Sequence, residues 1–344
     1  MQTPNPPTIL LIGATGNTGR GVTTTLPSLL RTSTNHSTHR ILALTRSLTS
    51  AASQSLLANP AIQVLEHPWP ELTTSWLRTH NVTRIFIAPH INTTLFAEES
   101  ALLIAALHAD VEYIVRVSTS APNVRPDSPV YYARMHWAIE NMLCSKAFAR
   151  SRMHWTSLQP NAFAPFFLSA AAGYINEFRS TGSQDSLALR LMAAEDVGSA
   201  IIDPGEVGVF AAHLLACPET AVHHGKKYVF NGPVDITGKE IVGLVGEVIG
   251  EAVRKENVVY QDMSVVDEVI LAMTSESRNV VGSIRYAMEA SWRGECRVET
   301  TSPEVREIAP ARKTPGEVLR ELVDGEENGR AGGLGKAPGM PSLY

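Results

Sequence analysis

A short apolar segment followed by three spaced glycines constrains the fold of this chain more than any other feature. Residues 9–22 read ILLIGATGNTGRGV, and Gly13, Gly16 and Gly19 lie between a strand-like run and a helix-like segment. A strand that ends in a glycine-rich turn and leads into a helix directs backbone N–H groups and the positive end of the helix dipole toward one point, which suits a pyrophosphate. A purely structural turn is the alternative, but the position of the loop at the start of an alternating pattern favours a dinucleotide site.

The first half of the sequence alternates short β-rich runs with helix-length segments. This alternation is typical of βαβ units whose parallel sheet is covered on both faces. It predicts an α/β chain with a Rossmann-type, doubly wound parallel sheet over residues 1–160. The predicted strands are 8–12, 40–45, 62–65, 84–88, 113–118 and a sixth within 155–163, and the predicted helices lie near 18–31, 70–80, 97–109 and 131–149.

The second half predicts a smaller α/β C-terminal substrate-binding lobe over residues 161–324, interleaved with the first domain. Its predicted elements are a strand pair at 187–192 and 199–203, a capped helix at 203–217, a strand at 226–233, a helix at 235–250 and helices at 264–276 and 279–290. Residues 261–323 could cover a pocket as a lid or pack as core. The last 20 residues, 325–344, hold six glycines and few large apolar groups, and we expect a disordered tail there.

Composition narrows the possible partners. The 344 residues carry a net charge of only −5, so no basic field is available and we predict no nucleic-acid partner. The segment MQTPNPPT has no positive charge and precedes too short an apolar run for a signal peptide or a membrane span, which predicts a cytoplasmic protein without a membrane partner. The three cysteines lack CxxC spacing and the histidines lack ligand spacing, so we expect neither disulfides nor a metal.

Several segments in order resemble one known family. They are GATGNTGR at the loop, ALTRS at 43–47, AALHADVEYIVRVSTS at 105–120, WTSLQPNAF at 155–163, AIIDPGEVGVFAAHLL at 200–215 and the strand and helix of 225–250. Together they resemble the NmrA-like family of atypical short-chain dehydrogenase/reductases, which includes isoflavone-reductase-like enzymes. The resemblance covers about residues 8–260 and implies a bound nicotinamide dinucleotide.

Arg46 bears on which dinucleotide is bound. It follows the second predicted strand, where a carboxylate would accept the ribose hydroxyl of NAD, whereas a guanidinium suits the 2′-phosphate of NADP(H). NADP(H) is therefore the predicted cofactor, although Arg46 could also be an ordinary surface arginine. The predicted cofactor-binding residues are Gly13, Thr15, Gly16, Asn17, Thr18, Gly19, Arg46, Pro89, His90 and Asn161.

The catalytic residues depart from the family pattern. Short-chain reductases usually supply the proton from a tyrosine with a lysine four residues later, and the resemblance implies a KxxxE helix at this place. Here Tyr132 precedes His136 by four residues, His136 stands where the lysine is expected, and Glu140 keeps the acid. His136 could be the general acid, with Tyr132 as the alternative donor and Ser118 bonding a substrate carbonyl. Alternatively the lysine was lost with the activity, and His136 is an ordinary helix residue.

Aromatic and hydroxyl side chains predict a hydrophobic pocket. The candidate substrate-binding residues are Thr119, Trp137, Phe163 and Phe166. Three functions fit these residues. The first is an NADP(H)-dependent reductase of a hydrophobic small molecule, with secondary metabolism as the expected context. The second is an NADP-binding redox-sensing regulator without turnover, and only this function would need a protein partner. The third is a non-redox isomerase, cyclase or epoxide-rearranging enzyme that uses an acid such as His136.

Overall fold

A seven-stranded parallel sheet forms the larger part of the molecule. The computed structural model describes residues 5–32 and 36–327. Strand order is β3-β2-β1-β4-β5-β6-β8, and every neighbouring pair in this sheet is parallel. The strands are β1 (Thr8–Ile12), β2 (Arg40–Thr45), β3 (Ile62–Glu66), β4 (Val82–Ile87), β5 (Tyr113–Val117), β6 (His154–Pro160) and β8 (Lys226–Phe230). The predicted Rossmann-type sheet is confirmed.

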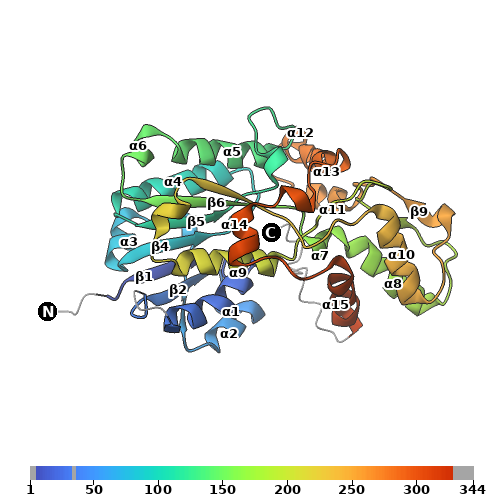
Figure 1. The fold of residues 1–344 in the computed structure, drawn as a ribbon, viewed down its shortest axis with the longest axis horizontal. Coiled ribbons are helices and arrows are strands. Elements are labelled where there is room, and N and C mark those ends of the chain that lie inside the picture. Colours follow the sequence, from blue (N-terminus) through green and yellow to red (C-terminus); the bar gives the residue numbers. More distant parts are fainter. Residues whose placement is uncertain (1–4, 33–35, 328–344) are drawn as a thin grey trace.

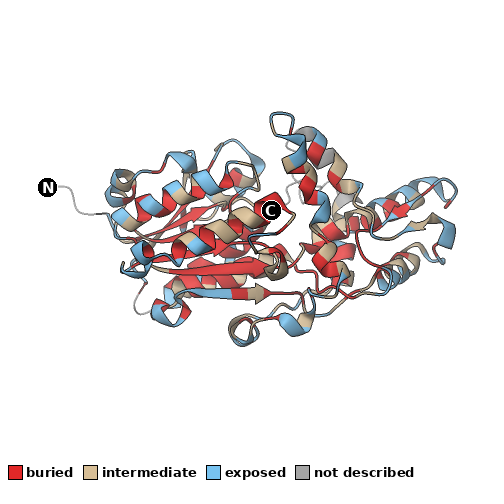
Figure 2. Cartoon of the chain, turned by 90° about the horizontal axis from the view of Figure 1, so that it is seen from above, coloured by how far each residue is buried: buried red, intermediate tan, exposed pale blue. Residues whose placement is uncertain are grey.

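Helices cover both faces of this sheet (Figure 1). One face carries α1 (Asn17–Thr32), α2 (Ala51–Leu57) and α9 (Pro204–Ala216), and the other carries α3 (Thr74–Thr79), α4 (Leu95–His108), α5 (Tyr131–Leu143) and α6 (Lys146–Ala149). The strands alternate accordingly: Ile9 and Leu11 pack toward α1 and α9, whereas Leu10 and Ile12 pack toward α3 and α4. The five inner strands β1, β2, β4, β5 and β6 are buried almost throughout (Figure 2), as a sheet covered on both faces requires, whereas the edge strands β3 and β8 are partly exposed.

Glycines allow α1 and α9 to approach each other closely. A Cβ built on Gly21 would lie 1.9 Å from the carbonyl oxygen of Gly205, and one on Gly208 would lie 2.0 Å from that of Thr18. Any side chain at these positions would separate the two helices. This contact joins the start of the chain to residues 204–216, so α9 belongs to the sheet domain although it follows the sixth strand by more than forty residues.

The remaining elements form a smaller lobe beside the sheet (Figure 1). Its core joins α7 and α8 to α10 and α15. The elements are α7 (Ala164–Phe167), α8 (Ser169–Thr181), β7 (Leu189–Arg190), α10 (Gly238–Ile249), β9 (Val258–Val259), α11 (Val265–Ala272), α12 (Arg278–Val281), α13 (Glu289–Trp292) and α15 (Pro315–Glu327). Helix α14 (Pro303–Ile308) instead packs against β8 and α9 of the sheet domain. The division at residues 160 and 161 stays a prediction.

Some predicted elements differ from the structure. The expected strand pair 187–192 and 199–203 is wrong: β7 pairs with β9, while Ser199 and Ile202 form only isolated bridges to Ile236 and Phe163. The predicted helix 131–149 breaks after Leu143, and the predicted helix 279–290 is two short helices around a 3-10 turn. Of the predicted disordered tail 325–344, residues 325–327 belong to α15 and residues 328–344 lie outside the described residues.

Candidate cofactor and substrate site

The glycine loop forms a backbone cradle at the point where the strand order reverses, between β1 and β4. Gly13 has a φ of +83°, and a Cβ there would lie 2.6 Å from the carbonyl oxygen of Ala88, just after β4. A Cβ on Gly19 would lie 2.1 Å from the carbonyl oxygen of Gly13. The loop closes with a 3.0 Å hydrogen bond from the Gly16 N–H to the Gly13 carbonyl. Only glycine therefore fits at Gly13 and Gly19 without moving the backbone.

The loop leaves its outer residues partly accessible. Thr15, Gly16 and Asn17 are half-buried, whereas Thr18 is buried against α9. Because β1 and β4 are neighbours and the chain returns on opposite sides of them, the loop lies at a topological switch point, where open α/β sheets bind ligands. The structure thus brings the predicted loop residues to the edge at which a dinucleotide pyrophosphate would be bound.

Three further predicted cofactor residues lie at the same edge. Arg46 is exposed directly after β2, and Pro89 and His90 follow β4 on the other side of β1. Desolvation, and then the positive charge of the nearby Arg46, lowers the pKa of His90, so this imidazole is neutral at pH 7. Arg46 and His90 therefore flank the cradle from the two strands on either side of β1.

Asn161 lies between the sheet and the smaller lobe. Its amide nitrogen donates to the carbonyl oxygens of Ala200 at 2.8 Å and Cys296 at 3.0 Å, and its amide oxygen accepts a 2.7 Å hydrogen bond from the Ala162 N–H. The amide thus holds together three segments that are distant in sequence. A contact of Asn161 with a cofactor stays a prediction.

A predominantly apolar cavity of about 80 Å³ opens beside these residues. Five of the predicted residues line it, namely Thr119, Tyr132, Asn161, Phe163 and Phe166. The smaller lobe contributes its other wall, with Met192, Met263, Val266, Ile284, Ala287, Met288 and Ser291. Segments within 261–323 therefore line the cavity, in addition to packing against the start of α5.

Trp137 is not among the lining residues of that cavity, although it was predicted to contact substrate. It is adjacent to His136 on α5, and one residue along a helix turns the side chain by about 100°, away from the face that carries Tyr132.

A second cavity of about 200 Å³ adjoins the first, and the two share Ser120, Asn161 and Cys296 as lining residues.

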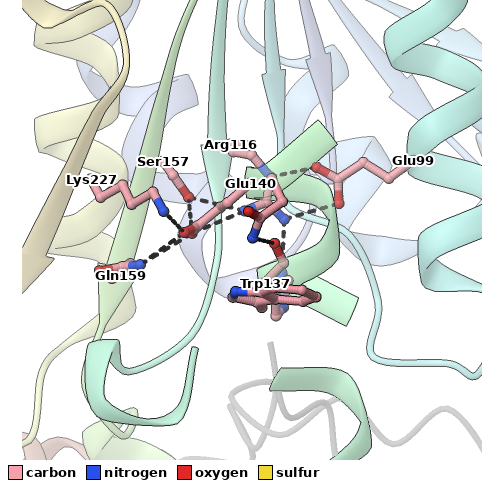
Figure 3. Close-up of polar contacts among 9 residues, drawn as sticks. Glu99, Arg116, Trp137, Glu140, Ser157, Gln159 and Lys227 are labelled. Carbon is pink, nitrogen blue, oxygen red and sulfur yellow. Dashed lines mark hydrogen bonds and ion pairs between the residues drawn. The ribbon is translucent and has the colours of Figure 1, made fainter. Parts of the chain in front are cut away.

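A buried charged cluster lies between the sheet and helices α4 and α5 (Figure 3). Arg116 on β5 is fully buried, and its guanidinium donates to Glu99 at 2.6 and 3.1 Å and to the Ser157 hydroxyl at 3.0 Å. It also forms an ion pair at 3.6 Å with Glu140, whose other oxygen pairs with Lys227 at 2.9 Å. Two cations thus balance two carboxylates.

Glu140 is ionised in this cluster. Burial would raise its pKa, but the Arg116 charge, the hydrogen bond from Ser157 and the Lys227 charge outweigh burial and hold the pKa below its ordinary value. Gln159 adds hydrogen bonds of 3.1 and 3.2 Å to the two carboxylate oxygens. Glu140, the acid of the expected KxxxE pattern, is therefore a fixed anion that is buried in the interior.

His136 belongs to the same cluster and is 2 % exposed. Its Nδ1 lies 2.7 Å from Nη2 of Arg116. A guanidinium only donates, so Nδ1 accepts and the imidazole proton must be on Nε2. Burial, followed by the Arg116 charge, lowers the pKa of His136 well below its ordinary value, so the ring is neutral. Its Nε2 is buried and finds no hydrogen-bond partner among the described residues.

Ser118 follows β5 two positions after Arg116, and its hydroxyl is likewise buried without a hydrogen-bond partner among the described residues. Because side chains alternate along an extended chain, Arg116 and Ser118 point to the same face, toward α4 and α5. The two unsatisfied polar atoms of Ser118 and His136 therefore lie on one face of the sheet near the carboxyl end of β5. Unsatisfied buried polar atoms are rare and are suited to a ligand.

Sequence reasoning missed most of this cluster, including Arg116, Glu99, Ser157, Gln159 and Lys227. One local signal was available: Arg116 interrupts the apolar strand YIVRV, and a charge inside a strand buried on both faces needs a buried partner. The identity of that partner could not be read locally, because Glu99 precedes it by 17 residues and Glu140 follows it on another helix.

Comparison with known proteins decides the family. Residues 6–301 match the model of the NmrA-like family. The chain belongs to this family. The resemblance stated from the sequence is thereby confirmed.

Relatives of this NmrA-like protein include several reductases. A (4-alkanoyl-5-oxo-2,5-dihydrofuran-3-yl)methyl phosphate reductase of Streptomyces griseus is 25% identical over 72% of this chain and 76% of its own length. An NADPH-dependent quinone oxidoreductase of Escherichia coli, solved with NADPH, is 20% identical with a TM-score of 0.65 and covers 91% of this chain and 99% of its own. A leucoanthocyanidin reductase of Vitis vinifera, solved with NADPH, is 15% identical with a TM-score of 0.63 over 92% and 99%. These structures share the fold.

Within the part of this NmrA-like chain that the structure describes, no helix is both long and apolar enough to cross a membrane. No group of three or more His, Cys, Asp or Glu side chains in residues 5–32 and 36–327 is arranged to hold a metal ion.

Proposed function

We propose that this NmrA-like protein is an NADPH-dependent reductase that acts on a neutral, hydrophobic small molecule bearing a carbonyl or a conjugated alkene. The observation that carries the proposal is the apolar cavity lined by Tyr132 beside the glycine cradle at the carboxyl edge of the sheet. The quinone oxidoreductase, the leucoanthocyanidin reductase and the Streptomyces reductase named above support it. A substrate from secondary metabolism stays part of the proposal.

The residues present fit a phosphorylated nicotinamide dinucleotide. The loop that contains Gly13, Gly16 and Gly19 would hold the pyrophosphate through those of its backbone N–H groups that are not used within the loop, as the Gly16 N–H is. Cβ atoms at Gly13 and Gly19 would collide with the backbone of the loop and of Ala88. Arg46 is exposed where a 2′-phosphate would need a guanidinium. When bound, the dinucleotide supplies a hydride. The buried, unsatisfied Ser118 hydroxyl suits a polar group at the same edge.

Tyr132 is the proposed proton donor. It lines the cavity, whereas His136, one turn further along α5, does not. Reduction of a carbonyl produces an alkoxide that must be protonated, and a phenol within the cavity can donate to it. Thr119 lines the same cavity and would orient the substrate oxygen, while Phe163 and Phe166 would pack against its apolar part.

The lining residues also indicate the charge of the substrate. Of the residues that line the two described cavities, none is a lysine or an arginine, and Glu295 is the charged one. A phosphate group would find no cationic partner there, because phosphate recognition uses arginine or lysine. The three lining methionines, Met192, Met263 and Met288, are polarizable and adaptable, which favours a planar or aromatic apolar substrate.

The geometry argues against acid-catalysed isomerisation through His136. A cationic imidazole would be a third positive charge beside Arg116 and Lys227, in a cluster whose four charges already balance. A regulator without turnover has no specific observation in its favour.

The test compares binding with turnover. Calorimetry with NADPH, NADP+ and NADH should show tighter binding of the phosphorylated forms, and a panel of quinones, enones and aromatic ketones should then consume NADPH, followed as loss of its absorbance. Tyr132→Phe should lower kcat by about a hundredfold or more and leave the Kd for NADPH unchanged. Ser100→Ala, on the outer turn of α4, is the matched control. Binding without oxidation of NADPH across the whole panel would instead indicate a sensor, and conversion at constant mass would indicate an isomerase.

A further inference from the structure

The imidazole of His136 is surrounded by fixed partners. The titratable and charged groups of its cluster come from every element packed around it, and they are Glu99 on α4, Arg116 on β5, Tyr132 and Glu140 on α5 and Lys227 on β8. Tyr132 meets the imidazole edge-on, with ring centroids 6.5 Å apart. Arg116 is the group that bonds to it directly.

Arg116 itself has little freedom. Its Nε and Nη2 atoms both donate to Glu99, at 2.6 and 3.1 Å, in the two-point geometry that fixes a guanidinium plane. The same Nη2 donates to Nδ1 of His136 at 2.7 Å, while Nη1 donates to Ser157. Glu99 therefore fixes Arg116, and Arg116 in turn decides which nitrogen of His136 can carry the proton.

We propose that Arg116 is a positioning residue that holds His136 as a neutral imidazole with its proton on Nε2, so that His136 is a hydrogen-bond donor to an oxygen of a bound ligand and not a cationic acid. The unsatisfied, buried Nε2 atom is the donor. Because His136 lines neither described cavity, the chemical class of its acceptor is a neutral hydroxyl or carbonyl oxygen of the dinucleotide and not of the substrate. Only this last identification rests on the proposed function.

The proposal is consistent with the electrostatics of the cluster. Two carboxylates face two cations, so a lysine or a protonated histidine at position 136 would leave one positive charge unbalanced in the interior. A neutral donor adds no charge. A neutral imidazole that donates to a ligand oxygen is an established way for histidine to polarise a carbonyl.

The first experiment reads the tautomer directly. Two-bond ¹H–¹⁵N correlation spectra of the full chain, labelled at histidine nitrogens, distinguish Nε2–H from Nδ1–H, and the His136→Asn spectrum assigns the signal. We expect an Nε2–H imidazole that does not titrate between pH 8 and pH 5. An Nδ1–H signal, or protonation within this range, would overturn the proposal whether or not the protein turns over NADPH.

The second experiment removes the positioning group without unbalancing the charge. In Arg116→Met combined with Glu99→Gln, one cation and one carboxylate are lost together, and we expect His136 to populate both tautomers and to titrate at higher pH than in the wild type. Glu99→Gln alone retains Arg116 and should keep the wild-type spectrum. If the double variant does not fold, Arg116→Gln combined with Glu99→Gln replaces it, because a glutamine amide can accept as well as donate and therefore does not fix the tautomer. An unchanged His136 spectrum in the folded variant would refute the role of Arg116.

Replacement of His136 separates a neutral donor from an acid. The amide of His136→Gln can donate from about the position of Nε2, whereas that of His136→Asn can accept from Arg116 but is too short to place its N–H donors at the position of Nε2. With the best substrate of the panel, His136→Asn should lower kcat about a hundredfold and His136→Gln distinctly less. Equal losses in both variants, or a kcat that follows an ionisation of residue 136, would contradict a neutral donor.

Discussion

Gly19→Ala tests whether the glycine loop is the cradle that binds the pyrophosphate of NADPH. A Cβ at this position would lie 2.1 Å from the Gly13 carbonyl oxygen and 2.7 Å from two Ala14 backbone atoms, whereas ordinary van der Waals contact begins at 3.4 Å. The loop backbone must therefore move by more than 1 Å. Overpacking of this kind costs about 1–3 kcal/mol of the free energy of unfolding. Loss of one charge-assisted hydrogen bond to the pyrophosphate, at about 1.5–3 kcal/mol, raises the Kd for NADPH by about ten- to a hundredfold.

Two measurements on the same samples are needed. Urea unfolding gives the stability, and calorimetric titration with NADPH gives the Kd at a temperature where the variant is folded. Gly173→Ala is the matched control, because this glycine lies inside α8 and a Cβ there meets nothing within 4 Å. The control should gain about 0.5–1 kcal/mol of stability and keep its Kd. A folded Gly19→Ala variant that binds NADPH as the wild type does would refute the assignment of the loop as the pyrophosphate cradle.

Three other perturbations test different parts of the molecule. Arg46→Glu should raise the Kd for NADPH about tenfold or more and leave that for NADH nearly unchanged, as measured by calorimetry; equal losses for both would mean that Arg46 does not contact a 2′-phosphate. Burial, with nearby Arg84, lowers the pKa of His36 to about 4, so above pH 6.5 both folded and unfolded chains are neutral there, and between pH 6.5 and 4 only the unfolded chain binds the proton. His36 should contribute up to about 3 kcal/mol to the fall in stability over that range, measured by urea unfolding as the difference between the wild type and His36→Gln, since His90 and His136 contribute to the remaining fall. Glu140→Leu should cost about 3–5 kcal/mol by urea unfolding, because it removes one carboxylate from between Arg116 and Lys227, while Glu140→Gln should cost less; a neutral effect of Leu would refute a tightly held cluster.

The sheet and the cradle could be predicted from the sequence because their signals are local. The alternation of apolar runs with helix-length segments predicts the fold class, and the glycine loop directly after the first apolar run predicts the edge of the sheet that binds the ligand. The strands of the smaller lobe are harder to predict from the sequence. Residues 199–203 are apolar like a strand, but their neighbours in space are Phe163 and Ile236, single positions rather than a strand, so only isolated bridges form. Tertiary context overrides local propensity there.

The polar cluster could not be predicted for a different reason. Its members belong to five elements, namely strands β5, β6 and β8 and helices α4 and α5, and Lys227 follows Glu140 by more than eighty residues. The sequence shows Arg116 inside an apolar strand, which demands a partner, but neither spacing nor periodicity identifies Glu99 or His136 as that partner. Only the way in which the sheet packs against α4 and α5 brings them together.

The cluster changes how the histidine at position 136 is interpreted. From the sequence alone, exchange of the expected lysine for His136 indicates either a substitute acid or a lost activity. In the structure a cation is still present there, because Nη2 of Arg116 lies 2.7 Å from Nδ1 of His136, and the charge of Arg116 is balanced by Glu99. The positive charge and the hydrogen-bond donor that one lysine would combine are thus divided between two residues, with the charge on β5 and the donor on α5. Loss of the lysine therefore does not imply loss of the site, because the Nε2 donor remains buried and unsatisfied where a ligand oxygen could accept it.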